Sequence, residues 1–335
     1  MKKMIRLISI LTAIILVLSG CSAGGNTTDS GSSPAPDASQ GKKQDLIMGT
    51  GGTAGTYYIV GVAMGQAVSE HSSINNIVVQ SSLGSMENIN LTNTNEMQLG
   101  FSNEDGIYFA YNATGPYEKT GKQDILGVMS LYQSAGQMVT KADSNIKTYA
   151  DLKGKKVCLG PPSTTIIEMS KAILREYGID PEKDITPFYL SFDEGITKVV
   201  DGELDATFYV AGTPTAALMN AASTTPMALV NADQSLLNSI AEKQPYYKPY
   251  VIPANTYKGI DYDVNTLKIM TTIFTNSKAS EEAIYDFVKN SLENIDTYKN
   301  AHAVVSEITP ETAAQMAIPL HPGAEKYFKE KGAIK

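Results

Sequence analysis

Residues 46–58 read LIMGTGGTAGTYY, a short apolar run followed by a loop of glycine, threonine and alanine. The apolar run is typical of a β-strand, and a helix is predicted from about Tyr57 to Glu70. Glycine leaves the backbone amides of such a loop accessible, and the start of a helix carries partial positive charge. The loop therefore predicts an anion site at a strand-to-helix junction.

Two further loops repeat this arrangement. Residues 82–85 (SLGS) precede a second predicted helix, which Ser85 could cap, and residues 160–165 (GPPSTT) precede a third at about 166–177. One such loop is usually only a turn, but three at strand-to-helix junctions would converge at the carboxyl ends of parallel strands. We therefore expect one crevice lined by glycine and hydroxyl groups.

Strand-like and helix-like segments alternate along the rest of the chain, which predicts an α/β fold with mainly parallel sheets. Capping boxes at residues 165–168 and 191–194 mark two helix starts, and Thr309-Pro310 marks another. A long helix is expected at about 281–300. The remaining predicted strands are residues 77–79, 97–101, 155–159, 186–190, 206–210 and 267–275.

The N-terminus has the features of an export signal. Three basic residues precede an apolar run, residues 7–18, that is short for a membrane span, so residues 1–20 are predicted to be a signal peptide. Residues 18–21 (LSGC) resemble a lipobox, which predicts a lipid on Cys21 and membrane contact through that lipid. The alternative is an uncleaved anchor helix with an incidental cysteine; either way the remainder lies outside the cytoplasm.

Residues 21–44 form a predicted tether, because they are rich in Ser, Gly, Thr, Asp and Pro and have almost no large apolar side chain. Loss of the three basic residues of the signal takes the formal net charge from -8 to about -11, which argues against a nucleic-acid partner. Cys158 then has no partner for a disulfide, and its strand-like surroundings predict a buried, inert thiol.

Catalytic and cofactor-binding alternatives find little support. Residues 49–54 match the dinucleotide pattern G-x-G-x-x-A, but the next strand runs into Gln80-Ser81-Ser82 and lacks the carboxylate that would hold a ribose. The three histidines, His71, His302 and His321, are widely spaced and expected at the surface. We therefore expect no cofactor, no metal and no enzymatic activity, with an exported hydrolase as the weaker alternative.

Several stretches together resemble the TAXI family of solute-binding proteins of TRAP (tripartite ATP-independent periplasmic) transporters. The first and last of them are the most specific, and together they extend over nearly the whole chain after the tether. They are residues 49–58, 83–88, 108–112, 146–155, 211–215 and 318–324.

This resemblance implies a two-lobed, periplasmic-binding-protein-like (type II) fold with a hinge and a ligand cleft between the lobes. Lobe 1 would comprise residues 45–134 plus 253–335 and lobe 2 residues 135–252, with crossings near Tyr132 and Ile252. Such a protein would deliver glutamate, a related amino acid or a dicarboxylate to a membrane permease driven by an ion gradient, and would act as a monomer. An exported sensor subunit is the alternative role.

The candidate ligand-binding residues are the hydroxyl, amide and glycine positions of the predicted junctions and strand ends. The mature chain has one arginine, Arg175, placed late in a helix, so we expect amides and hydroxyls to hold the carboxylate. Residues 163–166 depart from the Gly-Ser-Gly-Thr of the family, and Ile166 could make one end of the pocket more apolar. The candidates are Thr53, Thr56, Tyr57, Ser82, Ser85, Asn103, Tyr132, Ser163, Thr164, Thr165 and Gly212.

Overall fold

The computed structural model describes residues 43–162 and 164–335. The predicted signal peptide, the predicted lipidation at Cys21, the tether up to residue 42 and the candidate Ser163 lie outside these described residues. Within them, no helix is long and apolar enough to cross a membrane.

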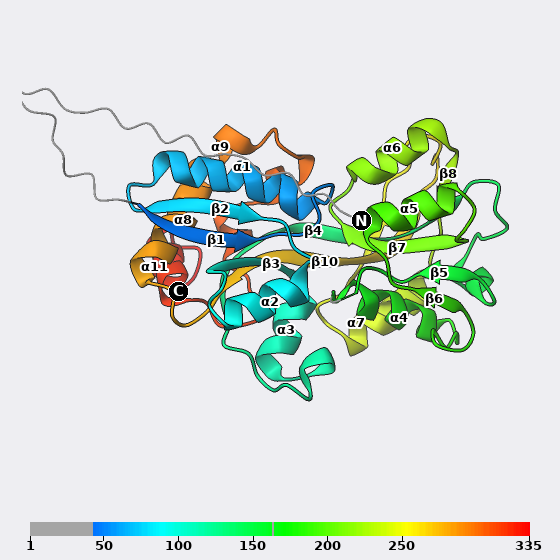
Figure 1. Cartoon of the computed structure of the whole chain (residues 1–335), viewed down its shortest axis with the longest axis horizontal. Coiled ribbons are helices and arrows are strands. Elements are labelled where there is room, and N and C mark those ends of the chain that lie inside the picture. Colours follow the sequence, from blue (N-terminus) through cyan, green and yellow to red (C-terminus); the bar gives the residue numbers. More distant parts are fainter. Residues whose placement is uncertain (1–42, 163) are drawn as a thin grey trace, which may run out of the picture. The chain divides into compact units, whose positions relative to one another are not determined.

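One mixed sheet runs through the described chain (Figure 1), in the order β2-β1-β3-β10-β4-β7-β5-β6, with β8 beside β4 and β9 beside β10. The expectation of mainly parallel sheets is wrong, because four strand pairings are parallel and five are antiparallel. The strands are β1 (Gln44–Gly49), β2 (Asn75–Gln80), β3 (Leu99–Asn103), β4 (Leu126–Lys141), β5 (Lys156–Cys158), β6 (Thr186–Phe188), β7 (Ala206–Ala211), β8 (Met227–Leu229), β9 (Lys248–Ile252) and β10 (Val264–Thr275).

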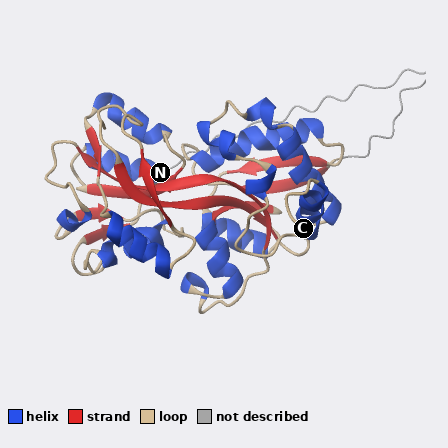
Figure 2. Cartoon of the chain, turned by 180° about the vertical axis from the view of Figure 1, so that it is seen from behind, coloured by secondary structure: helices blue, strands red, loops and turns tan. Residues whose placement is uncertain are grey.

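Helices cover both faces of this sheet (Figure 2). The helix expected at 281–300 is interrupted at Asn294, between α8 and α9. The helices are α1 (Thr56–His71), α2 (Ser85–Asn93), α3 (Glu104–Asn112), α4 (Ile166–Glu176), α5 (Phe192–Val200), α6 (Ala216–Thr224), α7 (Gln234–Lys243), α8 (Glu281–Glu293), α9 (Ile295–Tyr298), α10 (Pro310–Ala313) and α11 (Pro322–Glu330), with 3-10 turns η1 (Gly115–Tyr117), η2 (Tyr149–Leu152) and η3 (Ala303–Glu307).

The long strands β4 and β10 connect separate hydrophobic cores. Tyr132 of β4 and Ile273 of β10 belong to a core with α1, α8 and α11. Met138 and Ile269, further along the same two strands, belong to another core with α4 and α7. The helices α5 and α6 cover a third core on the opposite face of the sheet from α4 and α7 (Figure 1). Two continuous strands therefore join the halves of the described fold.

Local signals account for several helix starts. The capping box predicted at Ser191 is present, and the helix start predicted at Thr309-Pro310 is confirmed, with Thr309 as the N-cap of α10. The capping box predicted at Thr165 is wrong, because its side chain makes no bond to the first turn of α4. Ser85 does not cap α2 either: Gly84 occupies the N-cap position and Ser85 is the first helical residue.

Helices α8 and α11 approach so closely at Gly323 that no side chain fits there. A Cβ at this position would lie 2.2 Å from the Glu281 carbonyl oxygen and 2.8 Å from the Tyr285 amide nitrogen. We expect Gly323→Ala to lower the free energy of unfolding by about 1–3 kcal/mol, because the helices must separate. Urea denaturation measures this loss. Gly52→Ala, where a Cβ meets nothing within 4 Å, is the control, and equal stability of the two variants would contradict the packing described.

Candidate ligand-binding site

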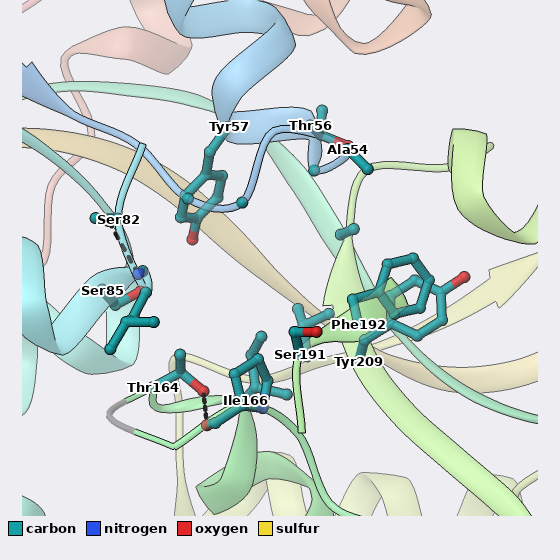
Figure 3. A pocket seen from close by; sticks show the side chains of 18 of the residues that line it. Ala54, Thr56, Tyr57, Ser82, Ser85, Thr164, Ile166, Ser191, Phe192 and Tyr209 are labelled. Carbon is teal, nitrogen blue, oxygen red and sulfur yellow. Dashed lines mark hydrogen bonds between the residues drawn. The ribbon is translucent and has the colours of Figure 1, made fainter. Parts of the chain in front are cut away.

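A cavity of about 220 Å³ opens where four strand-to-helix junctions meet the end of β7. Its volume is below the roughly 300–1,000 Å³ of sites for drug-sized ligands, so it suits a small solute. Figure 3 shows its lining side chains. The lining residues are Gly51, Gly52, Ala54, Gly55, Thr56, Tyr57, Ser82, Leu83, Gly84, Ser85, Pro161, Thr164, Ile166, Ser191, Phe192, Asp193, Tyr209, Val210 and Ala211.

Three of the helices that begin at this cavity have no side-chain cap. These are α1 after Gly55, α2 after Gly84 and α4 after Thr165. Side chains cap the starts of α5, α7, α8 and α11, whereas α3 and α6, which do not line the cavity, also lack a side-chain cap. First-turn amides have no partner within their own helix, so those of α1, α2 and α4 are available to a negatively charged group in the cavity.

The loop before α2 is shaped by glycine and by a small hydrogen-bond network. Gly84 has φ of 113°, which a residue with a side chain rarely adopts, and a Cβ there would lie 3.2 Å from Thr164 Cγ2. Ser82 Oγ donates to the Thr50 carbonyl at 2.9 Å and accepts from the Gly84 amide at 3.0 Å. These bonds tie the loop before α2 to Thr50, the residue after β1.

Five of the predicted residues line the cavity: Thr56, Tyr57, Ser82, Ser85 and Thr164. Three of their hydroxyl hydrogens are engaged elsewhere, since Tyr57 donates to Asn103 Oδ1 at 2.5 Å, Thr164 to the Pro161 carbonyl at 2.8 Å and Ser82 to the Thr50 carbonyl at 2.9 Å. Tyr57 and Thr164 therefore shape the cavity, and Asn103 orients Tyr57 from behind it.

Four other predicted residues lie away from the cavity lining. Thr53 is exposed, and Tyr132 is fully buried in the core. Gly212 allows a close approach, because a Cβ there would lie 2.7 Å from Val304 Cγ1 and 3.2 Å from Thr56 Cγ2. Thr165 is buried and turned towards Asp105. A direct role for these residues in binding stays a prediction.

The residues that sequence reasoning missed form an apolar wall. Phe192 and Tyr209 lie together, with ring centroids 3.5 Å apart, and Val210 follows Tyr209 on β7; Leu83 and Ile166 add apolar side chains elsewhere in the lining. Figure 3 shows Phe192 and Tyr209 across the cavity from Tyr57, Ser82 and Ser85. The signal for Phe192 was present in the sequence, because its capping box is a fourth strand-to-helix junction of the same kind.

The lining carries little charge. Asp193, an exposed residue at the start of α5, is the one charged residue of the lining among the described positions. Arg175 is exposed on α4 and is not part of the lining, as expected for a solvated helix residue. An anion in this cavity would therefore depend on amides, hydroxyls and helix dipoles.

A buried carboxylate lies behind the cavity. Asp105, on α3, is 1% exposed and accepts hydrogen bonds from Thr165 Oγ1 at 2.7 Å, the Tyr247 hydroxyl at 2.8 Å and the Gly106 amide at 2.7 Å. Burial raises the pKa of Asp105 to about 7, and these hydrogen bonds oppose the rise. The Thr165 hydroxyl that was expected to cap α4 is thus used to tie the start of α4 to α3.

The histidines have structural partners. His321 is 2% exposed and its Nδ1 accepts from the Gly323 amide, so the expectation that it lies at the surface is wrong. His302 accepts from the Val304 amide, and His71 lies against the Ala67 carbonyl. No group of three or more His, Cys, Asp or Glu residues within 43–162 and 164–335 could hold a metal ion. Cys158 is buried, as expected.

An α/β fold with a small cavity at converging helix starts can hold a small ligand, and solved structures share this fold at low sequence identity. A structure described as a periplasmic transporter matches 86% of this chain and 93% of its own, with a TM-score of 0.55 and 12% identity. The alkanesulfonate-binding protein SsuA from Xanthomonas axonopodis pv. citri, bound to MOPS, matches 86% of this chain and 85% of its own, with a TM-score of 0.49 and 15% identity.

The predicted α/β binding-protein fold is confirmed by the first of these matches; at such identities the likeness concerns the fold. Residues 48–332 match the NMT1-like family, and the chain belongs to that family.

The raised pKa of Asp105 predicts how stability depends on pH. Its pKa of about 7 in the folded protein lies above the ordinary 3.8, so between about pH 4 and pH 7 the folded protein holds a proton that the unfolded chain releases. The associated stability is complete below pH 4 and is lost as the pH rises through 7, by up to about 4 kcal/mol. Asp105→Asn should flatten this dependence, as measured by urea denaturation from pH 4 to 8; an unchanged slope would contradict the raised pKa.

Proposed function

We propose that this chain is the extracytoplasmic solute-binding subunit of a TRAP transporter of the TAXI type. In this role it captures a small carboxylate solute and delivers it to a membrane permease driven by an ion gradient. The sequence resemblance suggests glutamate, a related amino acid or a dicarboxylate. The chain works without cofactor or catalysis and is anchored to the membrane by a lipid on Cys21.

One observation carries the proposal: three uncapped helix N-termini, those of α1, α2 and α4, open on a single small cavity. Each supplies unpaired amides and a partial positive charge, and a carboxylate satisfies both. Among the described residues, no lysine or arginine lines the cavity. The positive charge around the solute is therefore only the partial charge of the helix starts, which a single carboxylate can balance. Membership in the NMT1-like family and the likeness to a periplasmic transporter structure support a binding role.

The proposal includes two lobes that close on the solute. Residues 45–134 plus 253–335 form lobe 1 and residues 135–252 form lobe 2 in the division suggested by the sequence resemblance. Packing favours a second lobe boundary inside β10 instead of at residue 252. Val264, at the start of β10, shares a hydrophobic core with Ile252 of lobe 2. The site draws α1 and α2 from lobe 1 and α4 and α5 from lobe 2, so closure assembles it.

Four classes of solute test this function directly. Purified protein from residue 43 onward is screened by thermal shift against amino acids, dicarboxylates, 2-oxo acids and simple monocarboxylates. A solute that binds only the folded protein stabilises it by about 3 kcal/mol at a hundredfold excess over Kd. We expect at least one carboxylate to raise the melting temperature, and no turnover of that solute. Hydrolysis of the solute would support the exported-enzyme alternative instead.

Ser82→Asp is the decisive variant. Its carboxylate would occupy the start of α2 and repel a solute anion, so the thermal shift should disappear although the protein remains folded. Ser223→Asp, at an exposed position on α6 outside the cavity, is the matched control and should keep the full shift. A normal shift in Ser82→Asp would place the solute elsewhere. Uptake of the solute by cells that lack this protein separates transport from a sensory role. If the protein serves transport, these cells lose uptake; if it serves only as a sensor, uptake continues.

A further inference from the structure

We propose that the solute is a small carboxylate whose far end is apolar, and that the cavity selects against a second carboxylate. This inference rests on the proposed function and names the solute class for the same site. It differs from the dicarboxylate or glutamate that the sequence resemblance suggests. Polar and apolar groups lie on different sides of the cavity.

The groups that attract an anion lie on one side. Ser82 and Ser85 lie at the start of α2 and Tyr57 at the start of α1, and Figure 3 shows these three side chains together. The uncapped first turns of α1 and α2 accompany them. One carboxylate can therefore be held at this side by the first-turn amides and the Ser85 hydroxyl.

The opposite side is apolar and held in place. Tyr209 is 2% exposed, and its hydroxyl bonds Thr215 Oγ1 at 2.8 Å and Gln137 Oε1 at 3.3 Å behind the wall, so only its ring faces the cavity. Phe192 lies against that ring. Val210 and Ala211 of β7 continue the same surface. The wall offers a solute contact area but few hydrogen-bond donors.

Ile166 closes the cavity from a third direction. It is the first residue of α4, packs over Gly160 and lines the cavity, so a hydrocarbon side chain stands beside the uncapped start of this helix. The β-branched side chain leaves little room for a hydrated group next to the wall.

A second carboxylate at the far end would meet the apolar wall and, among the described residues, no basic side chain. Burying a charge is costly unless it is paired or hydrogen-bonded, and the lining has no lysine, arginine or histidine among the described residues. The one charged lining residue, Asp193, lies next to Phe192 and would repel a second carboxylate. An alkyl group at the same place would instead be removed from water against Phe192, Tyr209 and Val210, which is favourable.

Two isosteric pairs of probes test this selectivity. 4-Methylpentanoate has an isopropyl group where succinate has its second carboxylate. Leucine and aspartate differ in the same way, but both also have an ammonium group. Isothermal titration at constant ionic strength gives each Kd. In whichever pair binds, we expect the apolar member to bind at least about tenfold tighter than the diacid. Its alkyl group is buried against the wall, whereas the second carboxylate of the diacid would be buried without a basic partner.

Variants of the wall identify its residues. Phe192→Ala should weaken binding of the apolar probe by about tenfold and change binding of its diacid partner by less than about threefold. Ile166→Thr keeps the branching at Cβ and replaces the ethyl group by a hydroxyl, so it provides the test if Phe192→Ala fails to fold. It should also reduce the preference for the apolar probe over its diacid partner. Tyr189→Ala, an aromatic truncation outside the cavity on the same segment, is the control and should leave both affinities unchanged.

The outcomes separate the two levels of the argument. Tighter binding of succinate or aspartate than of its apolar partner overturns this inference and leaves the proposed function standing. Binding of glutamate or 2-oxoglutarate with neither apolar probe has the same consequence. If no carboxylate binds at all, the proposed function fails as well.

Discussion

The site depends on backbone amides that the protein itself leaves without partners. Helices usually satisfy their first-turn amides with a side chain, as α5, α7 and α8 do here. At the cavity, α1 and α2 begin at glycine, which supplies no such group. A missing cap costs about 1 kcal/mol, so three of them at one place are a local loss of stability that the proposed carboxylate would offset.

Asp105 explains why the third helix start is also open. Thr165 has the residue type and spacing to cap α4, but its hydroxyl donates to the Asp105 carboxylate. One side chain thereby leaves the amides of α4 uncapped and fixes them beside α3. Tyr247, from the loop after α7, donates to the other carboxylate oxygen. The buried carboxylate therefore connects elements of both proposed lobes behind the cavity.

The glycine and hydroxyl loops at residues 49–56 and 82–85 were predictable because both their residue types and their position between a strand and a helix are visible in the local sequence. The missed features depend on tertiary contacts. Strand β4 was not predicted, since Ser130, Ser134 and Gln137 interrupt its apolar pattern; these polar residues are buried because partners on other strands and loops accept or donate to them. The cap at Thr165 failed for the same reason: a distant carboxylate outcompeted the local amide. The apolar wall requires β7 and α5 to meet, which no single segment encodes.

The most direct measurement follows the amide groups themselves by NMR, in a titration of 15N-labelled protein with a carboxylate that raises its melting temperature. The account predicts the largest downfield proton shifts at the first-turn amides of α1, α2 and α4, near Thr56, Ser85 and Ile166, with little change at the capped starts of α7 and α8. Shifts confined to other parts of the fold, with these three helix starts unperturbed, would contradict it.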